Sequence, residues 1–163
     1  MKTLFLMRHA KSSWEDKSLS DFERPLNERG RRTVPFMGEL MRQRGLSPAS
    51  IMSSPAVRAA ETAMAVKNAA MFDAEIVFDP GIYEASPNDL RKVVLEMDEG
   101  VETAMIVGHN PGLEGFIYYL TGGMEPMPTA ALAVIELDTK WSEIEEGAGR
   151  LATVIRPKDE MQG

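Results

Sequence analysis

The chain has 163 residues, of which 44% are hydrophobic and 26% charged, a composition typical of one soluble globular domain. Its net charge of -7 and the lack of a long basic run argue against a nucleic-acid partner. The absence of cysteine excludes disulfides, thiolate zinc sites and a cysteine nucleophile. No segment approaches the ~20 apolar residues of a membrane helix, so we expect a cytoplasmic protein without a membrane partner. We also expect a monomer.

The order of apolar runs and amphipathic stretches predicts strands that alternate with helices. The first strand covers residues 3–7, and the polar segment that follows, residues 10–26, is long enough to be functional. A helix is predicted over 27–44, where Pro35 marks either a kink or a later start. The later elements are a strand at 50–53, a helix that Ser54 caps and Pro55 opens, a strand at 75–78, a helix at 87–99, a strand at 103–107, a helix at 111–120, and strands at 131–137 and 151–155.

These elements predict an α/β fold, a three-layer α/β/α sandwich around a mostly parallel sheet of about six strands. One domain is expected over residues 1–163, with 158–163 as a loose tail. Ligands of such sheets bind at the carboxyl ends of the strands, so the residues that follow the predicted strands are candidates for function.

The chain contains two histidines, and each follows a predicted strand. A neutral imidazole is a competent nucleophile toward phosphorus, and the guanidinium of Arg8, next to His9, can bind phosphate oxygens. His109 lies before a helix that starts at Pro111, where it can act as a donor toward an anion. The alternatives are a strand-end histidine beside a surface arginine for Arg8 and His9, and a capping or core histidine for His109.

Arg58 falls in the first turn of the helix after Ser54, where a cation opposes the helix dipole. That placement makes sense if the guanidinium reaches into a phosphate site; the alternative is an exposed arginine paired with Glu61 or Thr62. Two histidines so far apart in the sequence lack any metal-ligand spacing, and no Gly-x-Ser-x-Gly motif is present. We therefore expect no metal, no cofactor and no Ser-His-Asp catalysis.

Taken together, three motifs resemble those of the histidine phosphatase superfamily. They are the Arg-His pair after the first strand, the Ser-Ser-Pro-x-x-Arg-x-x-x-Thr stretch over residues 53–62, and Gly-His-Asn at 108–110, and they occur in the family's order. The segments 8–12 and 21–30 further resemble the SixA-type phosphohistidine phosphatase branch, since 21–30 reads Asp-x-x-Arg-Pro-Leu-x-x-x-Gly. The resemblance implies a phosphoglycerate mutase-like fold.

The resemblance also implies roles for residues. His9 is the expected nucleophile, and Arg8, Arg58 and His109 are expected to bind the phosphoryl group. The phosphate charge would favour an imidazolium at His109 while His9 stays neutral. Glu84 is either the general acid or an ordinary loop glutamate. Further expected substrate contacts, each with a structural alternative such as an ion pair or a helix cap, are Ser12, Asn110, Asp21 and Arg24.

The activity implied is hydrolysis of phosphohistidine in a phosphorylated protein, for example a histidine-phosphotransfer domain. Two other functions stay open at this point. One is a phosphatase of small phosphate esters, such as sugar or nucleotide phosphates. The other is a non-catalytic module that binds phosphorylated proteins through the same pocket.

Overall fold

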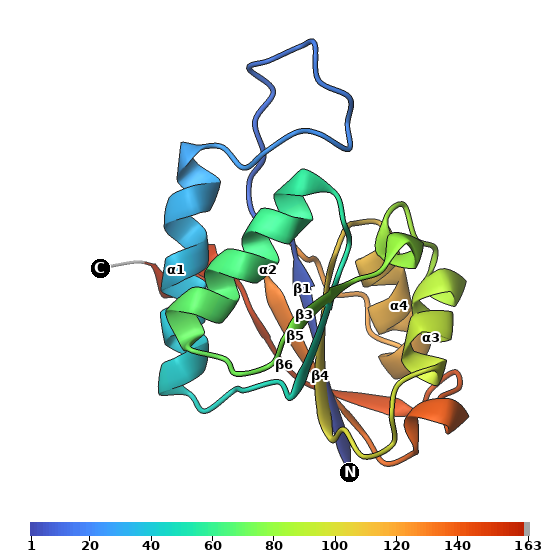
Figure 1. Ribbon diagram of the computed structural model, residues 1–163. Coiled ribbons are helices and arrows are strands. Elements are labelled where there is room, and N and C mark those ends of the chain that lie inside the picture. The colour runs from blue at the N-terminus through green and yellow to red at the C-terminus, as the bar shows by residue number, and fades with distance from the viewer. Residues whose placement is uncertain (162–163) are drawn as a thin grey trace.

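The computed structural model describes residues 1–161 and is built around one six-stranded sheet in the order β3-β2-β4-β1-β5-β6 (Figure 1). The strands are β1 (Lys2–Arg8), β2 (Ser50–Ser53), β3 (Ile76–Phe78), β4 (Thr103–Gly108), β5 (Leu132–Leu137) and β6 (Gly149–Ile155). The first four pair in parallel, whereas β5 runs antiparallel to both β1 and β6. The expectation of a mostly parallel sheet is confirmed, with β5 as the reversed strand.

Helices cover both faces of this sheet. The helices among residues 1–161 are α1 (Glu28–Gln43), α2 (Val57–Ala70), α3 (Pro87–Leu95), α4 (Gly112–Thr121) and α5 (Pro157–Glu160), with short 3-10 turns η1 (Pro80–Ile82) and η2 (Trp141–Glu143). Figure 1 shows α1 and α2 on one side of the sheet and α3 and α4 on the other. The three-layer α/β/α arrangement is therefore confirmed, although α3 ends four residues before the predicted limit of 99.

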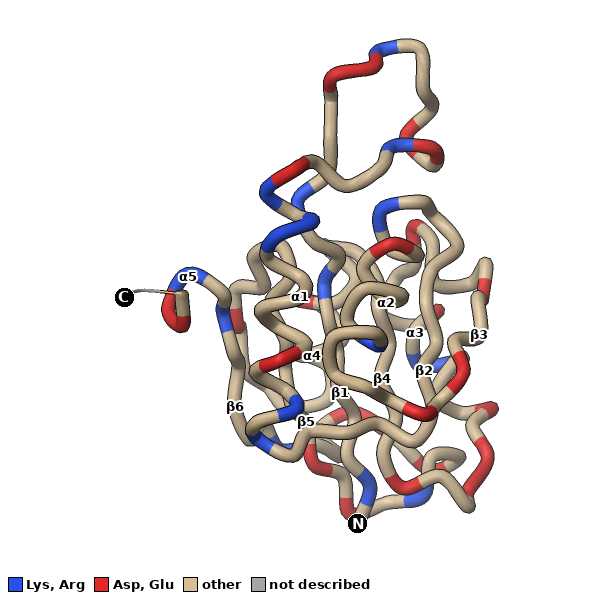
Figure 2. The backbone as a smooth tube through the Cα atoms, turned by 60° about the vertical axis from the view of Figure 1, so that its left-hand side comes forward, with Lys and Arg blue, Asp and Glu red and all other residues tan. Residues whose placement is uncertain are grey.

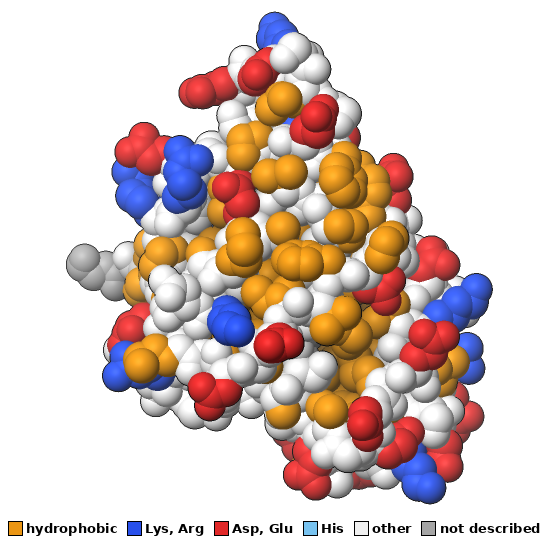
Figure 3. All heavy atoms as spheres, viewed as in Figure 1, with side chains coloured by type: hydrophobic (Ala, Val, Ile, Leu, Met, Phe, Trp, Pro, Cys, Tyr) orange, Lys and Arg blue, Asp and Glu red, His pale blue; other side chains and the backbone are white. Residues whose placement is uncertain are grey.

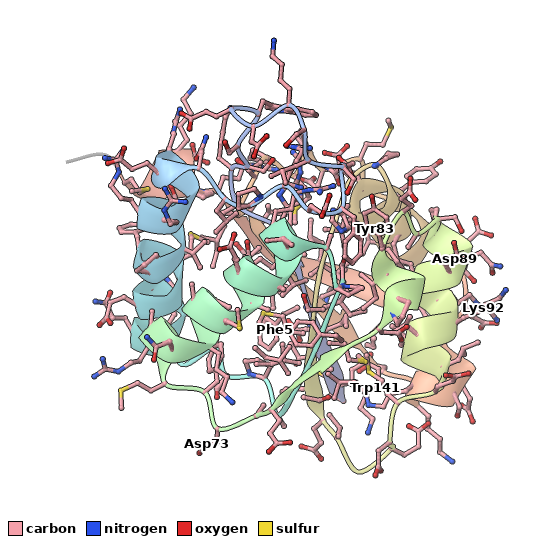
Figure 4. The ribbon with its side chains drawn as sticks, turned by 45° about the horizontal axis from the view of Figure 1, so that its top comes forward. Phe5, Asp73, Tyr83, Asp89, Lys92 and Trp141 are labelled. Carbon is pink, nitrogen blue, oxygen red and sulfur yellow. The ribbon has the colours of Figure 1, made fainter. Side chains whose placement is uncertain are left out.

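Successive side chains of β1 point to opposite faces of the sheet, and both faces are buried, which explains why its apolar run is unbroken. Leu4 and Leu6 pack with the core between the sheet and α3 and α4, while Phe5 and Met7 pack with the core under α1 and α2. Figure 4 shows Phe5 in the interior. A parallel strand covered on both faces needs apolar side chains at every position. Each such buried side chain contributes about 1.5–3 kcal/mol of hydrophobic free energy, so the central strand is held firmly.

Strand register brings three functional segments to one edge of the sheet. Arg8 lies beside Gly108, and Ser53 lies beside Val107. The pairing continues one residue further, because two backbone amides after the strand ends donate to β4 carbonyls at 3.0 Å. The residues that come next in the chain therefore meet at the same edge: His9, Ser54 and His109.

The segment between β1 and α1 projects from this edge as a long loop, at the top of Figure 1. An antiparallel bridge between Ser12 and Leu26 closes its base, and the Asn27 amide donates to the Lys11 carbonyl at 2.9 Å. Gly30 is required beside this bond, because a Cβ there would overlap the Lys11 carbonyl. The loop is thus anchored where it leaves and rejoins the domain.

Two expectations about helix boundaries differ from the structure. The side chain of Asn27 caps α1 by accepting from the Gly30 amide at 2.8 Å, and the helix then runs through Pro35. A later start at Pro35 is therefore wrong. The segment 158–163, expected to be a loose tail, is helical over its first three residues, and Arg44 pairs with Glu160 at 2.9 Å. Residues 162–163 lie outside the described residues.

Hydrophobic side chains gather over α2 and β3 on the face shown in Figure 3. Exposed ones include Met64 on α2 and Val77 and Phe78 on β3. The strand β3 is an edge strand of three residues, a length that limits pairing with a strand of another chain. Within residues 1–161, no helix is long and apolar enough to cross a membrane.

Candidate active site

A pocket of about 310 Å³ opens where β1, β2 and β4 end, and we call it the histidine pocket. Seven of the nine residues expected from the sequence line it together. Three lining residues were not expected: Lys11, Trp14 and Thr129. The full lining is Arg8, His9, Lys11, Ser12, Trp14, Arg24, Arg58, His109, Asn110 and Thr129. The remaining two expected residues, Asp21 and Glu84, line an adjoining groove that shares Arg58 and His109 with the pocket.

The environment of His9 selects one tautomer of its ring. The Nδ1 atom lies 2.7 Å from the carbonyl oxygen of Ala10. A carbonyl oxygen only accepts hydrogen bonds, so Nδ1 carries the proton and Nε2 keeps a free electron pair. Ala10 is held in turn by Thr62, whose hydroxyl accepts from the Ala10 amide at 3.0 Å. His9 is therefore presented with Nε2 as the nucleophilic atom.

Burial keeps His9 uncharged. Its side chain is 7% exposed, and burial lowers the pKa of His9 to about 4. The positive guanidiniums of Arg58 and Arg8 contribute to this lowering of the pKa, while the hydrogen bond to Ala10 opposes it. The imidazole is consequently neutral at pH 7, the form that a nucleophile requires.

His109 faces His9 across the pocket, with ring centroids 5.2 Å apart. Its Nε2 atom lies 2.8 Å from the Ser54 hydroxyl, which accepts from the Ala56 amide at 3.2 Å. Ser54 was expected to cap α2, but that helix starts at Val57 with Ala56 at its N-cap. The expectation for Ser54 is wrong, because the turn over residues 54–56 directs its hydroxyl to His109 instead.

Burial also keeps His109 neutral at pH 7. Burial, together with the neighbouring His9 and Arg58, lowers the pKa of His109 to about 3, while the Asp21 carboxylate opposes this shift. Its Nδ1 atom is buried without a hydrogen-bond partner among the described residues. A bound oxyanion would supply the opposite charge that favours the imidazolium. Protonation of His109 therefore depends on a ligand.

The lowered pKa values of His9 and His109 predict that the free energy of unfolding falls in acid. In the unfolded chain a histidine takes up a proton near pH 6.5, whereas His9 and His109 resist protonation until about pH 4 and 3 in the fold. The unfolded state binds more protons as pH falls from 6.5 toward 4, so acid favours unfolding, by at most about 1.4 kcal/mol per pH unit for each histidine. Urea unfolding at pH 7, 6 and 5 measures this slope. His9→Gln and His109→Gln should each flatten it, and an unchanged slope in both variants would contradict the assignment.

Arg58 is held by the long loop. From the first turn of α2 it donates to the Asp21 carbonyl at 2.7 Å and to the Asp21 carboxylate at 3.0 Å. The alternative partners, Glu61 and Thr62, do not bind the guanidinium; Glu61 accepts from the Leu26 amide at 2.8 Å. Arg58 is 7% exposed, so this positive charge is fixed at the pocket wall.

Asp21 collects three side-chain hydrogen bonds. Tyr83 donates its hydroxyl at 2.7 Å, and Arg24 and Arg58 donate at 2.9 and 3.0 Å. The hydrogen bond from Tyr83 and those from the two arginines lower the pKa of Asp21 to about 2. The carboxylate is therefore ionised at all physiological pH values and positions Arg58. The ion pair between Asp21 and Arg24, which was the structural alternative for these two residues, is present.

The other polar groups of the loop bind each other. Arg24 donates from Nε to the Ser13 carbonyl at 3.1 Å and from Nη2 to the Ser12 hydroxyl. The Trp14 ring covers this guanidinium, with Cζ 3.3 Å from the ring centroid, a cation–π contact. All three nitrogens of Arg24 thus have partners within the loop, and its charge remains at the pocket.

Asn110 binds the carboxylate of Glu114, a residue not expected from the sequence, and shares the Met127 carbonyl with Arg8. Asn110 donates from Nδ2 to Glu114 at 2.9 Å and to the Met127 carbonyl at 2.9 Å, and Arg8 donates to the same carbonyl at 3.1 Å. Asn110 also accepts from the Glu114 amide at 3.3 Å, as in its helix-capping alternative. Glu114 stands four residues after Asn110, a helical spacing that could have suggested the pair.

Tyr83 and Glu84 form the wall of the adjoining groove. The Tyr83 ring packs edge-on against His109, at 5.5 Å between centroids, and lies on the side of the molecule that carries the long loop (Figure 4). Burial and the neighbouring Asp21 carboxylate raise the pKa of Tyr83 to about 12. Glu84 is exposed, with φ of 55°, and lies outside the histidine pocket. Within residues 1–161, no group of three or more His, Asp or Glu side chains is placed to hold a metal ion.

Comparison with known proteins shows which family the chain belongs to. Residues 4–106 match the model of the histidine phosphatase superfamily (branch 1). An uncharacterized chloroplastic protein of Arabidopsis thaliana is 30% identical over 152 residues, which cover 87% of this chain and 70% of that protein. The match to the family model extends over more than half of the chain and includes β1, β2 and β3.

Solved structures show the same fold. A protein of Agrobacterium tumefaciens assigned as the phosphohistidine phosphatase SixA has a TM-score of 0.81 at 28% identity, covering 96% of this chain and 98% of that chain. A mycobacterial glucosyl-3-phosphoglycerate phosphatase has a TM-score of 0.71 at 16% identity, covering 94% and 98%, a likeness in fold alone. Family match and structural likeness together support a phosphatase, and the chain belongs to the histidine phosphatase superfamily.

Proposed function

We propose that the protein removes the phosphoryl group from phosphohistidine in a protein substrate, through a phosphorylated His9 and without a metal ion. The observation that carries the proposal is the state of His9. Its Nδ1 proton is held by Ala10, and its neutral Nε2 faces a pocket lined by Arg8, Arg58 and His109. A nucleophile surrounded by fixed positive charge suits attack on a phosphoryl group.

The first step transfers the phosphoryl group to the protein. The electron pair on His9 Nε2 forms a new P–N bond while the P–N bond to the substrate imidazole breaks. Arg8 and Arg58 neutralise the phosphoryl oxygens, and the substrate's charge raises the proton affinity of His109, which then donates to a further oxygen. Fixed charges of this kind need no reorganisation during the reaction, so they stabilise the transition state more than the ground state.

The second step releases phosphate. Water attacks phosphorus, the P–N bond to His9 breaks, and Nε2 regains its electron pair while phosphate leaves.

The departing substrate imidazole of the first step needs a proton, and the phosphohistidine ring carries one when it is itself protonated. We assign Glu84, exposed on the wall of the adjoining groove, as the candidate proton donor for less favourable leaving groups.

The rim of the site favours a protein substrate. Trp14 is 71% exposed at the mouth of the histidine pocket, and Phe22, 38% exposed, packs against Tyr83 at 5.1 Å between centroids. Exposed aromatic side chains are enriched where proteins bind each other, so this rim suits contact with a protein surface. The likeness to the Agrobacterium SixA protein supports the same substrate class.

Comparison of substrates tests the proposal. A histidine-phosphotransfer domain phosphorylated with phosphoramidate, a sugar phosphate and a nucleotide phosphate are assayed side by side with a chelator present. We expect kcat/KM to be highest, by at least about 100-fold, for the phosphohistidine protein, and to be unaffected by the chelator. Preference for the small esters would assign the same site to a small-ester phosphatase. Saturable binding of the phosphoprotein without phosphate release would indicate a binding module.

Asp21→Asn should lower kcat/KM by about 10- to 100-fold, because the neutral amide no longer fixes both Arg58 and Arg24. Tyr83→Phe, which removes one of the hydrogen bonds to Asp21, should have a smaller effect. Both variants are compared by steady-state kinetics, with the effect on KM separated from the effect on kcat. Higher activity in Asp21→Asn would show that Asp21 competes with the phosphoryl group for Arg58 instead of positioning it.

A further inference from the structure

A second groove, of about 450 Å³, continues from the histidine pocket. The two share Lys11 and Thr129 in their linings, so the groove starts at the mouth of the pocket. Four cationic side chains line it, and we call it the basic groove: Lys11, Arg29, Arg32 and Lys158. None of these cations except Lys11 lines the histidine pocket, so the groove is a separate surface with its own charge.

The basic groove stands out on an acidic protein. The chain carries a net charge of -7, yet no Asp or Glu lines this groove. Arg32 is 3.5 Å from Glu28, an exposed pair worth little on a surface. Among residues 1–161, Lys11, Arg29 and Lys158 make no ion pair. Figure 2 shows blue segments at the start of α1 and on α5, the two helices that supply most of this charge.

Two contacts fix the three elements that carry the cations of the basic groove. The carbonyl of Lys11 accepts from the Asn27 amide at 2.9 Å, which fixes the base of the long loop against α1. The ion pair of Glu160 with Arg44 fixes α5 against the end of α1 and occupies one of the two acidic side chains of α5. The cations therefore stand on three separate elements that are fixed to one another.

We propose that the basic groove binds acidic side chains that lie beside the phosphohistidine on the protein substrate. This inference rests on the proposed function and adds a substrate specificity to it. A groove larger than the histidine pocket, with cations spread over three elements, fits several carboxylates of a protein surface better than one further phosphate. Complementary charge at the edge of a site mainly sets substrate affinity and encounter rate, so KM is expected to respond and kcat is not.

Two synthetic peptides test the inference. Each carries one phosphohistidine; one has aspartates on both sides of it, and the other has asparagines at the same positions. In the wild-type protein we expect the aspartate peptide to have a KM about 10-fold lower. The double substitution Arg29→Glu/Lys158→Glu should abolish this difference and leave kcat unchanged. Free phosphohistidine, which cannot reach the groove, should be hydrolysed equally by both proteins.

A matched control carries the same change of charge elsewhere. Lys92 on α3 and Lys140 before η2 are exposed and line neither the histidine pocket nor the basic groove. Lys92→Glu/Lys140→Glu should keep the preference for the aspartate peptide. Loss of the preference in this control would attribute it to net charge and overturn the inference, as would equal KM values for the two peptides in the wild-type protein.

Failure of the inference is distinguishable from failure of the proposed function. If the protein releases phosphate from both peptides with equal KM, hydrolysis of phosphohistidine stands and the basic groove has no part in it. If it releases phosphate from neither peptide but acts on p-nitrophenyl phosphate, the proposed function fails and the inference with it.

A third assay compares fructose 1,6-bisphosphate with glucose 6-phosphate. A KM that rises about 10-fold in Arg29→Glu/Lys158→Glu for the bisphosphate alone would assign the groove to a second phosphate and overturn the choice of a protein substrate.

Discussion

Replacing His9 with alanine is expected to lower kcat by about 10⁴-fold or more, the scale seen when a covalent nucleophile is removed. No other residue in the histidine pocket can replace its Nε2 atom, because the only other imidazole, His109, bonds Ser54 through its own Nε2. Phosphate release from the phosphohistidine protein measures the effect. The variant should keep its cooperative thermal unfolding, since the alanine removes a ring whose only polar bond is to the adjacent residue.

Two further measurements make this prediction specific. Addition of free imidazole should restore part of the activity of the His9→Ala protein, because imidazole can enter the space left by the ring and act as the nucleophile. His109→Gln should lower kcat less than His9→Ala does, since it removes a donor and not the attacking atom. Equal activity of the His9→Ala and wild-type proteins would refute the role of His9.

Arg58→Gln is the substitution with the second largest expected effect, a loss of about 10²- to 10³-fold in kcat/KM. The guanidinium is buried and fixed by Asp21, so we expect it to bind the phosphoryl oxygens with little competition from water. Glutamine keeps polar atoms but removes the charge and the paired donors. Steady-state kinetics on the phosphohistidine protein give the loss, and Arg58→Lys should recover only part of it, because a single ammonium does not reproduce the fork of donors.

An ion pair elsewhere serves as the control for Arg58→Gln. Arg150 on β6 also pairs with a carboxylate, that of Glu136, at 2.8 Å, and lies on the edge strand away from the histidine pocket. Arg150→Gln should change kcat/KM less than 2-fold, within the range of a surface pair that contributes little. If Arg58→Gln behaved like Arg150→Gln, the positive charge at position 58 would have no part in the reaction.

The fold followed closely from periodicity in the sequence. The continuous apolar run at residues 3–7 and the amphipathic stretch before Gly45 indicated a buried strand and a covering helix, as the structure has them. The convergence of His9 and His109 also followed, because both come directly after strands that pair in parallel. Side chains at strand ends are positioned by the sheet, so their place can be inferred before any contact is known.

The contacts that tune the site were harder to infer. Asp21 reaches Arg58 from the long loop, 37 positions away in the chain, and its direction depends on how that loop folds over α2. Ser54 was assigned to a helix cap because its sequence context fits one, and the turn before Val57 overrides that local preference. Glu114 was missed although its helical spacing from Asn110 was visible in the sequence, because its second partner, the Met127 amide, is fixed only by the fold.

Protonation states were the least accessible from sequence. The pKa of His109 falls to about 3 through burial, together with the nearby His9 and Arg58. None of these causes is visible before the side chains are placed. The expectation that the phosphate charge favours an imidazolium at His109 stays a prediction, and the low pKa of the ring makes that charge a requirement for protonation at pH 7.

Trapping of the intermediate tests the central claim most directly. The protein is mixed with ³²P-labelled phosphohistidine substrate, quenched in alkali, in which phosphohistidine survives, and digested for mass spectrometry of the labelled peptide. We predict a single phosphorylated residue, His9, whose label appears and decays as fast as phosphate is released. Label on any other residue, or turnover at full rate with His9 never labelled, would contradict the covalent mechanism.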